Sequence, residues 1–253
     1  MKIIERLGQF IGIYLAGLII LLGIKYLYHL SDYLIPPLSE IIAVSKSYGL
    51  MYFSAVINTA AVAVSGHFLA IILAAIVAFL GKASNVWGNI TKTAAYNLQA
   101  YPIVAVSPII FLFFGDGLAS RLIIASIICY FPLLLSFIGI FSQPVEDVEH
   151  FYAVTGRLNW KMEMSIRIFE NLDKITTVTA GSGTLAFVGA IVAEFLAATQ
   201  GIGYLVRKAL YQSNLAKILL ALFLIGFLTS IYISLIDTLG AWIKRRLSGE
   251  KLF

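Results

Sequence analysis

Charged residues are scarce in this 253-residue chain, where lysine, arginine, aspartate and glutamate together make up 12% of the sequence. Ordinary soluble domains carry about 25%. The few charges are also unevenly distributed, because ten of the 31 lie within residues 144–174. With 60% apolar residues, a chain of this kind has two solvents, lipid and water. Residues 144–174 form its principal water-facing segment.

The sequence also lacks the residues that several classes of protein require. The single cysteine, Cys129, excludes a disulfide within the chain. The three histidines, His29, His67 and His150, are widely separated, and we find no metal-ligand cluster or Ser/His/Asp set. No glycine-rich loop ends in Lys-Ser or Lys-Thr, the pattern of a phosphate-binding loop. We therefore expect no catalytic residue, no metal and no cofactor bound by this chain.

Long uncharged runs are what the sequence has instead. Six of them, 18 to 35 residues long, cover residues 7–24, 47–81, 93–115, 122–145, 175–193 and 218–236. A helix needs about 20 mostly apolar residues to cross a hydrocarbon core, where no backbone polar group can stay unpaired.

These runs predict one all-α integral membrane domain over residues 1–253 with about six transmembrane helices. The predicted spans lie approximately at residues 7–27, 55–80, 95–114, 120–142, 176–198 and 216–242. The second run is too long for one crossing, so we expect residues 47–54 to lie along the outer interface. Pro102 and Pro108 predict kinks in the third span.

The basic residues predict an orientation. If the N-terminus is cytoplasmic, twelve basic residues fall in the inner segments and six in the outer ones. The outer six are Lys25, Lys46, Arg121, Arg207, Lys208 and Lys217. Because lysine and arginine are enriched on the cytoplasmic side, we expect both termini and residues 144–174 to be cytoplasmic. The same enrichment explains the net charge of +5 without a nucleic-acid partner.

Residues 144–174 read as two short amphipathic helices hinged at Gly156, a residue that suits a helix end. One interpretation is a docking element for a soluble partner. The other is a pair of interfacial helices resting on lipid headgroups. The residues by themselves favour neither.

Two further features concern the fifth span. Small residues recur along one face of it, a pattern that lets membrane helices approach closely. We therefore expect this helix to be central to the bundle, and we expect two copies of it to approach each other near a dimer axis. The span also contains Glu194, a carboxylate at membrane depth, where insertion costs at least about 2.5 kcal/mol. Asn97 and Gln99 lie in or beside the third span, and hydrogen bonding between helices is the alternative explanation for them.

Several segments, in this order, resemble one family. They are Ile35-Pro-Pro-Leu-Ser-Glu40, Pro102-Ile-Val-Ala-Val-Ser-Pro108, the Gly156 segment, Val192-Ala-Glu194 and Gly201-Ile-Gly203-Tyr204-Leu205. The chain is similar to the permease subunit of ATP-binding-cassette importers, of the nitrate/sulfonate/taurine binding-protein-dependent type. The resemblance covers roughly residues 35–246.

This resemblance implies a transport function and a set of partners. The expected partners are a dimer of ATP-binding subunits, which would hold the ATP and magnesium, an extracytoplasmic solute-binding protein and a second permease copy, most simply a homodimer. The expected location is the cytoplasmic (inner) membrane of a prokaryote. Nitrate, sulfonates, bicarbonate and vitamin precursors all remain open as solutes.

The resemblance also implies residue roles. In the family's coupling loop, an acidic-Ala-Ala triplet precedes the glycine that corresponds to Gly156, and an apolar residue and a Leu-Pro pair follow. Here the triplet reads His150-Phe151-Tyr152 and the pair reads Ile168-Phe169, which implies a reshaped socket on the ATPase. The expected ATPase-coupling residues are Val148, His150, Phe151, Tyr152, Gly156, Arg157 and Ile166.

A translocation pathway or gate is expected at a second set of residues. These are Asn97, Gln99, Pro102, Pro108, Glu194, Gly201, Gly203 and Tyr204. The alternative function is a proton-coupled secondary carrier with Glu194 as its proton site, although no inverted repeat is visible in the sequence.

Overall fold

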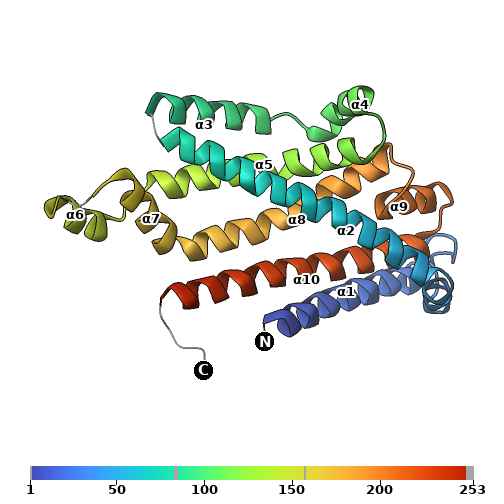
Figure 1. The fold of residues 1–253 in the computed structure, drawn as a ribbon. Helices are drawn as coiled ribbons and strands as arrows, with labels where there is room; N and C mark the ends of the chain where they lie inside the picture. Colours follow the sequence, from blue (N-terminus) through green and yellow to red (C-terminus); the bar gives the residue numbers. More distant parts are fainter. Residues whose placement is uncertain (1, 83–84, 157, 249–253) are drawn as a thin grey trace.

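The computed structural model describes residues 2–82, 85–156 and 158–248 (Figure 1). These residues form ten helices: α1 (Lys2–Leu27), α2 (Leu38–Lys82), α3 (Asn85–Gln99), α4 (Ile103–Phe114), α5 (Leu118–Ser142), α6 (Glu146–Val154), α7 (Trp160–Glu170), α8 (Leu172–Leu196), α9 (Ile202–Tyr211) and α10 (Leu215–Leu247). The prediction of an all-α integral membrane protein is confirmed.

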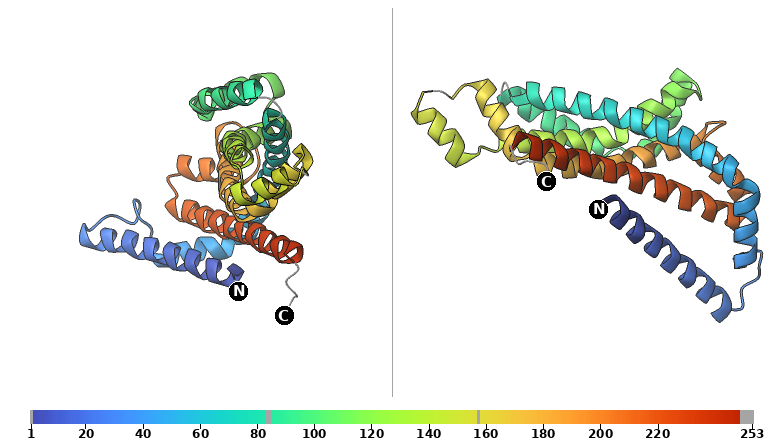
Figure 2. Two further views of the ribbon diagram at one scale, coloured as in Figure 1. Left: turned by 90° about the vertical axis from the view of Figure 1, so that its left-hand side faces the viewer. Right: turned by 60° about the horizontal axis from the view of Figure 1, so that its bottom comes forward.

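The long helices lie side by side, with α2, α5 and α8 packed against one another and α10 against α1, α2 and α8 (Figures 1 and 2). Within the described ranges, α1, α2, α5, α8 and α10 are each long and apolar enough to cross a membrane. The short helix α6 projects beyond one end of the bundle, and α4 and α9 lie at the other end. The start of α1 and the end of α10 both face the α6 end.

The predicted third span is not a single helix. It is divided between α3 and α4, whose axes differ by 94°. The two helices count as a sixth span only if the bent pair is taken as one. Pro102 sits at the start of α4 with φ −68°. It has no N–H to continue α3, and its ring disfavours helical geometry at the preceding residue.

The second span is longer than expected. Helix α2 runs unbroken from Leu38 to Lys82, so residues 47–54 belong to the same helix as the span that follows. Figure 2 shows that the first turns of α2 bend away from the axis of the rest. Long membrane helices accommodate excess length by tilting or bending.

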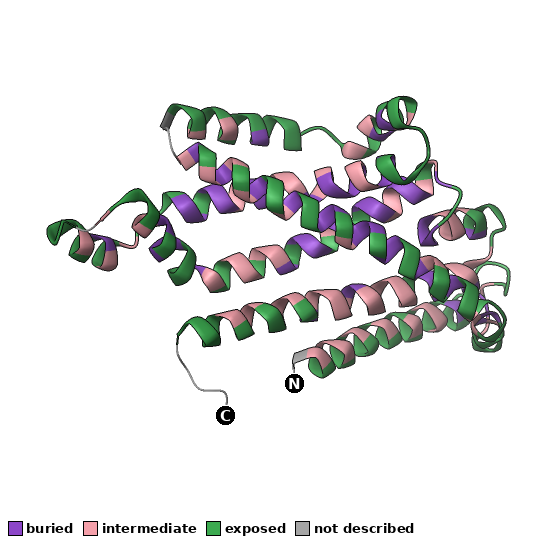
Figure 3. Cartoon of the chain, viewed as in Figure 1, coloured by how far each residue is buried: buried purple, intermediate pink, exposed green. Residues whose placement is uncertain are grey.

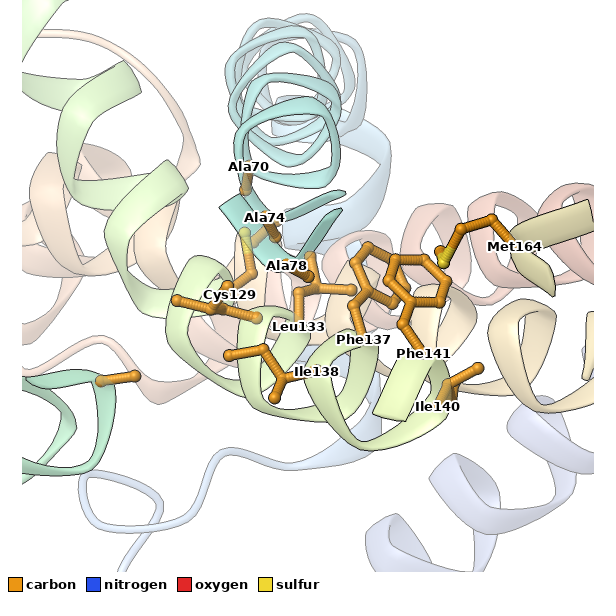
Figure 4. Close-up of a cluster of buried hydrophobic side chains, with 13 residues drawn as sticks. Ala70, Ala74, Ala78, Cys129, Leu133, Phe137, Ile138, Ile140, Phe141 and Met164 are labelled. Carbon is orange, nitrogen blue, oxygen red and sulfur yellow. The ribbon is translucent and has the colours of Figure 1, made fainter. Parts of the chain in front are cut away.

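The core lies where α2, α5 and α8 meet (Figure 3). Ala70, Ala74 and Ala78 of α2 face Leu133 and other large side chains of α5 (Figure 4). Alanine on one helix opposite leucine and phenylalanine on the next lets the two backbones come close while the space between them stays filled.

The small-residue face of α8 is used inside the chain. Gly183, Ala186, Ala190 and Ala193 are all buried, and a Cβ added at Gly189 would lie 2.8 Å from the Cα of Ala125 on α5. The prediction that this helix is central to the bundle is confirmed. This face packs on α5 and α2 of the same chain. The approach of two copies of α8 near a dimer axis stays a prediction.

This packing predicts an asymmetry between two glycines of α8. Gly189→Val should lower the stability of the full chain by about 1–3 kcal/mol, because the new side chain meets the α5 backbone. Gly181→Val is the matched control, since a Cβ there meets no atom within 4 Å. Thermal unfolding of both variants in lipid nanodiscs measures the difference, and equal melting temperatures would contradict the close α5–α8 contact.

Candidate functional site

The segment between α5 and α8 forms the two helices that the sequence predicted. Gly156 lies in the loop between them with φ +68°, a conformation that glycine adopts without strain. The side chain of Asn159 caps α7 by accepting a hydrogen bond from the Met162 N–H at 2.9 Å. We call α6, α7 and the loop between them the coupling segment.

Arg167 anchors this segment to the bundle. Its Nε donates to Glu149 Oε1 at 2.6 Å, its Nη2 to Glu149 Oε2 at 2.9 Å, and its Nη1 to the Phe141 carbonyl at 2.5 Å. The bidentate bond to the buried guanidinium lowers the pKa of Glu149 below its usual value. Glu163 links Arg167 at 2.6 Å to Lys82 at 3.1 Å. The arginine therefore ties α6 and α7 to the ends of α5 and α2.

The predicted coupling residues fall into three groups. His150, Phe151 and Gly156 are exposed, Val148 and Tyr152 are half-buried, and Ile166 is buried at 8% exposure. Arg157 lies outside the described residues. Sequence reasoning did not select Val154, a residue of α6 that is 73% exposed. Phe151, which it did select, is 63% exposed.

A second cluster surrounds Glu194, at the end of the bundle opposite α6. Glu194 is 0% and Arg121 1% exposed, and the Arg121 Nη2 group donates to both Glu194 and the Asn58 Oδ1, the latter at 2.7 Å. The other carboxylate oxygen accepts from Thr59 Oγ1 at 2.6 Å and from the Gly203 N–H at 3.0 Å. One carboxylate thus joins α2, α5, α8 and α9.

The turn from α8 to α9 closes over this carboxylate. Gly201 has φ +95°, and a Cβ there would lie 2.2 Å from the Glu194 Cδ. A Cβ at Gly203 would lie 2.4 Å from the Ile191 carbonyl oxygen. Any other residue at either position would push the turn away from Glu194. Arg207 holds the turn from outside by donating to three carbonyls, those of Phe195, Leu196 and Ala198, at 2.8–3.0 Å.

Sequence reasoning missed Arg121 as a partner of Glu194, because it counted Arg121 among the outer loop cations. A signal was present, since Arg121 lies inside the predicted fourth span and charges at membrane depth are almost always paired. Lys25, also counted as outer, is buried against Asp32 at 2.5 Å. Two of the six outer cations are therefore fixed in ion pairs.

The remaining predicted pathway residues are not brought together with Glu194. Gln99 and Pro102 line a pocket of about 450 Å³ between the α3–α4 bend and α5. Asn97 and Pro108 are exposed and do not line that pocket. Tyr204 is half-buried, with the Arg207 guanidinium 5.5 Å from its ring centroid.

Residues 66–249 match the family described as the binding-protein-dependent transport system inner membrane component. The chain belongs to this family. The match covers the second part of α2, α3 to α10 and the coupling segment, and Asn58 and Thr59 of the Glu194 cluster precede it. It confirms the resemblance to permeases of ATP-binding-cassette transporters.

Individual permeases are similar over part of their length. The riboflavin transport system permease protein RibX of Chloroflexus aurantiacus is 35% identical over 49% of this chain and 47% of its own. The formylaminopyrimidine transport permease protein ThiX of Halalkalibacterium halodurans is 26% identical over 70% and 71%. The putative aliphatic sulfonates transport permease protein SsuC of Bacillus subtilis is 26% identical over 55% and 52%. The chain thus spans about half the length of RibX and of SsuC.

The buried ion pair of this permease generates a double-mutant prediction. Glu194→Gln leaves Arg121 charged and unpaired, and Arg121→Met leaves the carboxylate unpaired. Breaking a buried pair in this way costs about 3–5 kcal/mol. The double variant Arg121→Met/Glu194→Gln removes both charges and keeps an amide beside Thr59 and the Gly203 N–H. We expect it to be more stable than either single variant.

Melting temperature and the yield of folded protein in nanodiscs measure this coupling for the full chain. Additive losses in the double variant would show that the two side chains do not depend on each other.

Proposed function

We propose that this chain is the membrane-spanning subunit of an ATP-driven importer. It would form the route for a small solute that an extracytoplasmic binding protein delivers, and a separate pair of ATPase subunits would hydrolyse ATP. Membership of the binding-protein-dependent family and similarity to three proteins named as transport permeases support this proposal. A second copy of the permease would complete the assembly.

The observation that carries the proposal is the geometry of α6. The helix projects from the bundle (Figure 1) and exposes Phe151 and Val154 to solvent. Exposed apolar side chains on a water-facing helix are typical of a contact with another protein. At its base, Arg167 ties α6 to α5, so α6 cannot move without displacing the end of a transmembrane helix.

This arrangement gives ATP a way to act at a distance. ATP binding favours the closed form of the ATPase pair. Because α6 would be docked on the ATPase subunits, it would move with them when they close. The Arg167 contacts would pass the displacement to α5, α7 and, through Glu163 and Lys82, to α2. The bundle would alternate between a conformation open to the inside and one open to the outside. The ATPase pair can shift the equilibrium between these two conformations only by the difference in its affinity for them.

The rival function is a secondary carrier that uses Glu194 as a proton site. The structure gives this idea little support, because the Glu194 carboxylate is already committed to Arg121, Thr59 and the Gly203 N–H. A carrier site needs a carboxylate that exchanges its proton with water, and Glu194 has no exposed surface in this conformation.

A charge placed on α6 tests the coupling function. Phe151→Asp with Val154→Asp should weaken ATPase binding by about tenfold or more, because the contact would bury unpaired carboxylates. Ser165→Asp is the matched control, since Ser165 is an exposed residue of α7 to which we assign no contact. Co-purification with the ATPase and ATP-driven uptake in proteoliposomes are the measurements.

Full ATPase binding by the α6 variant would eliminate the docking role. Uptake driven by a proton gradient in vesicles that lack ATP would instead establish the secondary carrier.

We also propose that both termini and the coupling segment face the cytoplasm. The sequence asymmetry of basic residues supports this, and the structure places α6 and the end of α10 toward the same end of the bundle. After Cys129→Ala, a cysteine at Asp147 should stay unlabelled by a membrane-impermeant thiol reagent in intact cells, and one at Tyr33 should react. Tyr33 is chosen because it is exposed and leaves the Lys25–Asp32 pair intact. The opposite labelling pattern would invert the topology.

A further inference from the structure

The pocket at the α3–α4 bend has a structural origin in two prolines. Pro102 separates α3 from α4, and Pro132 lies inside α5 on the opposite wall. Because Pro132 has no N–H, the carbonyl of Ile128 lacks its usual donor four residues along the helix. Helix α4 begins at Ile103 with no capping side chain, so its first N–H also lacks a partner within the helix. Irregular backbone at membrane depth is tolerated where it is buried in protein or lines a cavity.

The walls of this pocket carry no charge. Among the described residues that line it, the side-chain polar groups are the Gln99 amide and the Tyr101 hydroxyl, and the rest are aliphatic residues, proline and Phe131. An inorganic oxyanion or a sulfonate would lose its hydration there without meeting a cation, which is costly. Tyr101 and Phe131 contribute aromatic surface to the pocket, which favours an aromatic ring.

The polar side chains at the pocket include both hydrogen-bond donors and acceptors. The Gln99 amide and the Tyr101 hydroxyl can each donate and accept a hydrogen bond. A heteroaromatic ring with N–H and C=O groups on its edge presents the complementary pattern, whereas an oxyanion presents acceptors alone. The pocket volume of about 450 Å³ lies within the range of small-molecule sites.

We infer that this pocket is a solute subsite that takes a flat, uncharged heteroaromatic molecule and rejects small oxyanions. The inference rests on the proposed importer function and narrows its solute to one chemical class. It also assigns different roles to Gln99 and Pro102. The Gln99 side chain would hydrogen-bond to the edge of the ring, and Pro102 creates the bend between α3 and α4.

Lumichrome, an uncharged and fluorescent tricyclic heterocycle, is a suitable probe for the full chain in nanodiscs. We expect saturable binding that excess nitrate or ethanesulfonate does not displace. Leu98→Trp should weaken this binding by about tenfold or more, because it fills the pocket from an exposed position of α3. Leu112→Trp, an exposed position of α4 outside the pocket, should leave the affinity unchanged. Gln99→Leu should weaken binding without changing the melting temperature.

Three results would overturn the inference. They are lumichrome binding no greater than to empty nanodiscs, displacement by either anion, and equal affinity of the Leu98→Trp and Leu112→Trp variants. If Leu98→Trp changes only the oligomeric state in native mass spectrometry, the pocket is a contact between copies and the subsite is refuted.

The importer function is tested separately by uptake. ATP-dependent uptake of an oxyanion that is insensitive to Leu98→Trp would refute this subsite and leave the importer function standing. Uptake that is independent of ATP would refute the importer function itself.

Discussion

The ion pair between Arg121 and Glu194 is the contact on which the arrangement of the central helices depends. Each side chain is fully buried, and burying either charge without the other would carry a large desolvation cost. Each helix can therefore hold its charged residue there only because the other supplies the opposite charge. The carboxylate takes further hydrogen bonds from Thr59 and the Gly203 N–H. Satisfying one buried anion therefore fixes α2, α5, α8 and α9 relative to one another.

This requirement explains local features that otherwise look unrelated. The turn after α8 must bring a backbone N–H to the carboxylate, and only glycine at positions 201 and 203 lets it come so close. Small residues along α8 let α5 approach closely enough for the arginine to reach. A side chain at Gly189 would separate α5 from α8 and so affect the pair as well as the packing.

Helices α2 and α5 connect the two ends of the molecule. At one end they hold Thr59 and Arg121 of the buried cluster, and at the other they supply Lys82 and the Phe141 carbonyl to the contacts around Arg167 and Glu163. Helices α1 and α3 carry far less buried surface (Figure 3). The fold thus joins the coupling segment to a rigid core, and it leaves the α3–α4 bend at the edge, where the pocket lies.

The sequence by itself determined which segments face lipid and which face water, and hence that this is a membrane protein with most of the observed spans. It also predicted the two helices hinged at Gly156. These follow from local composition and periodicity, because a membrane-crossing run must be mostly apolar. It also marked Glu194, Gln99 and Pro102 as unusual. Only the tertiary structure decided that Glu194 pairs with Arg121, that Glu149 pairs with Arg167, and that α8 packs within its own chain. Those contacts join residues 73 and 18 positions apart, and no local pattern encodes which distant charge neutralises which.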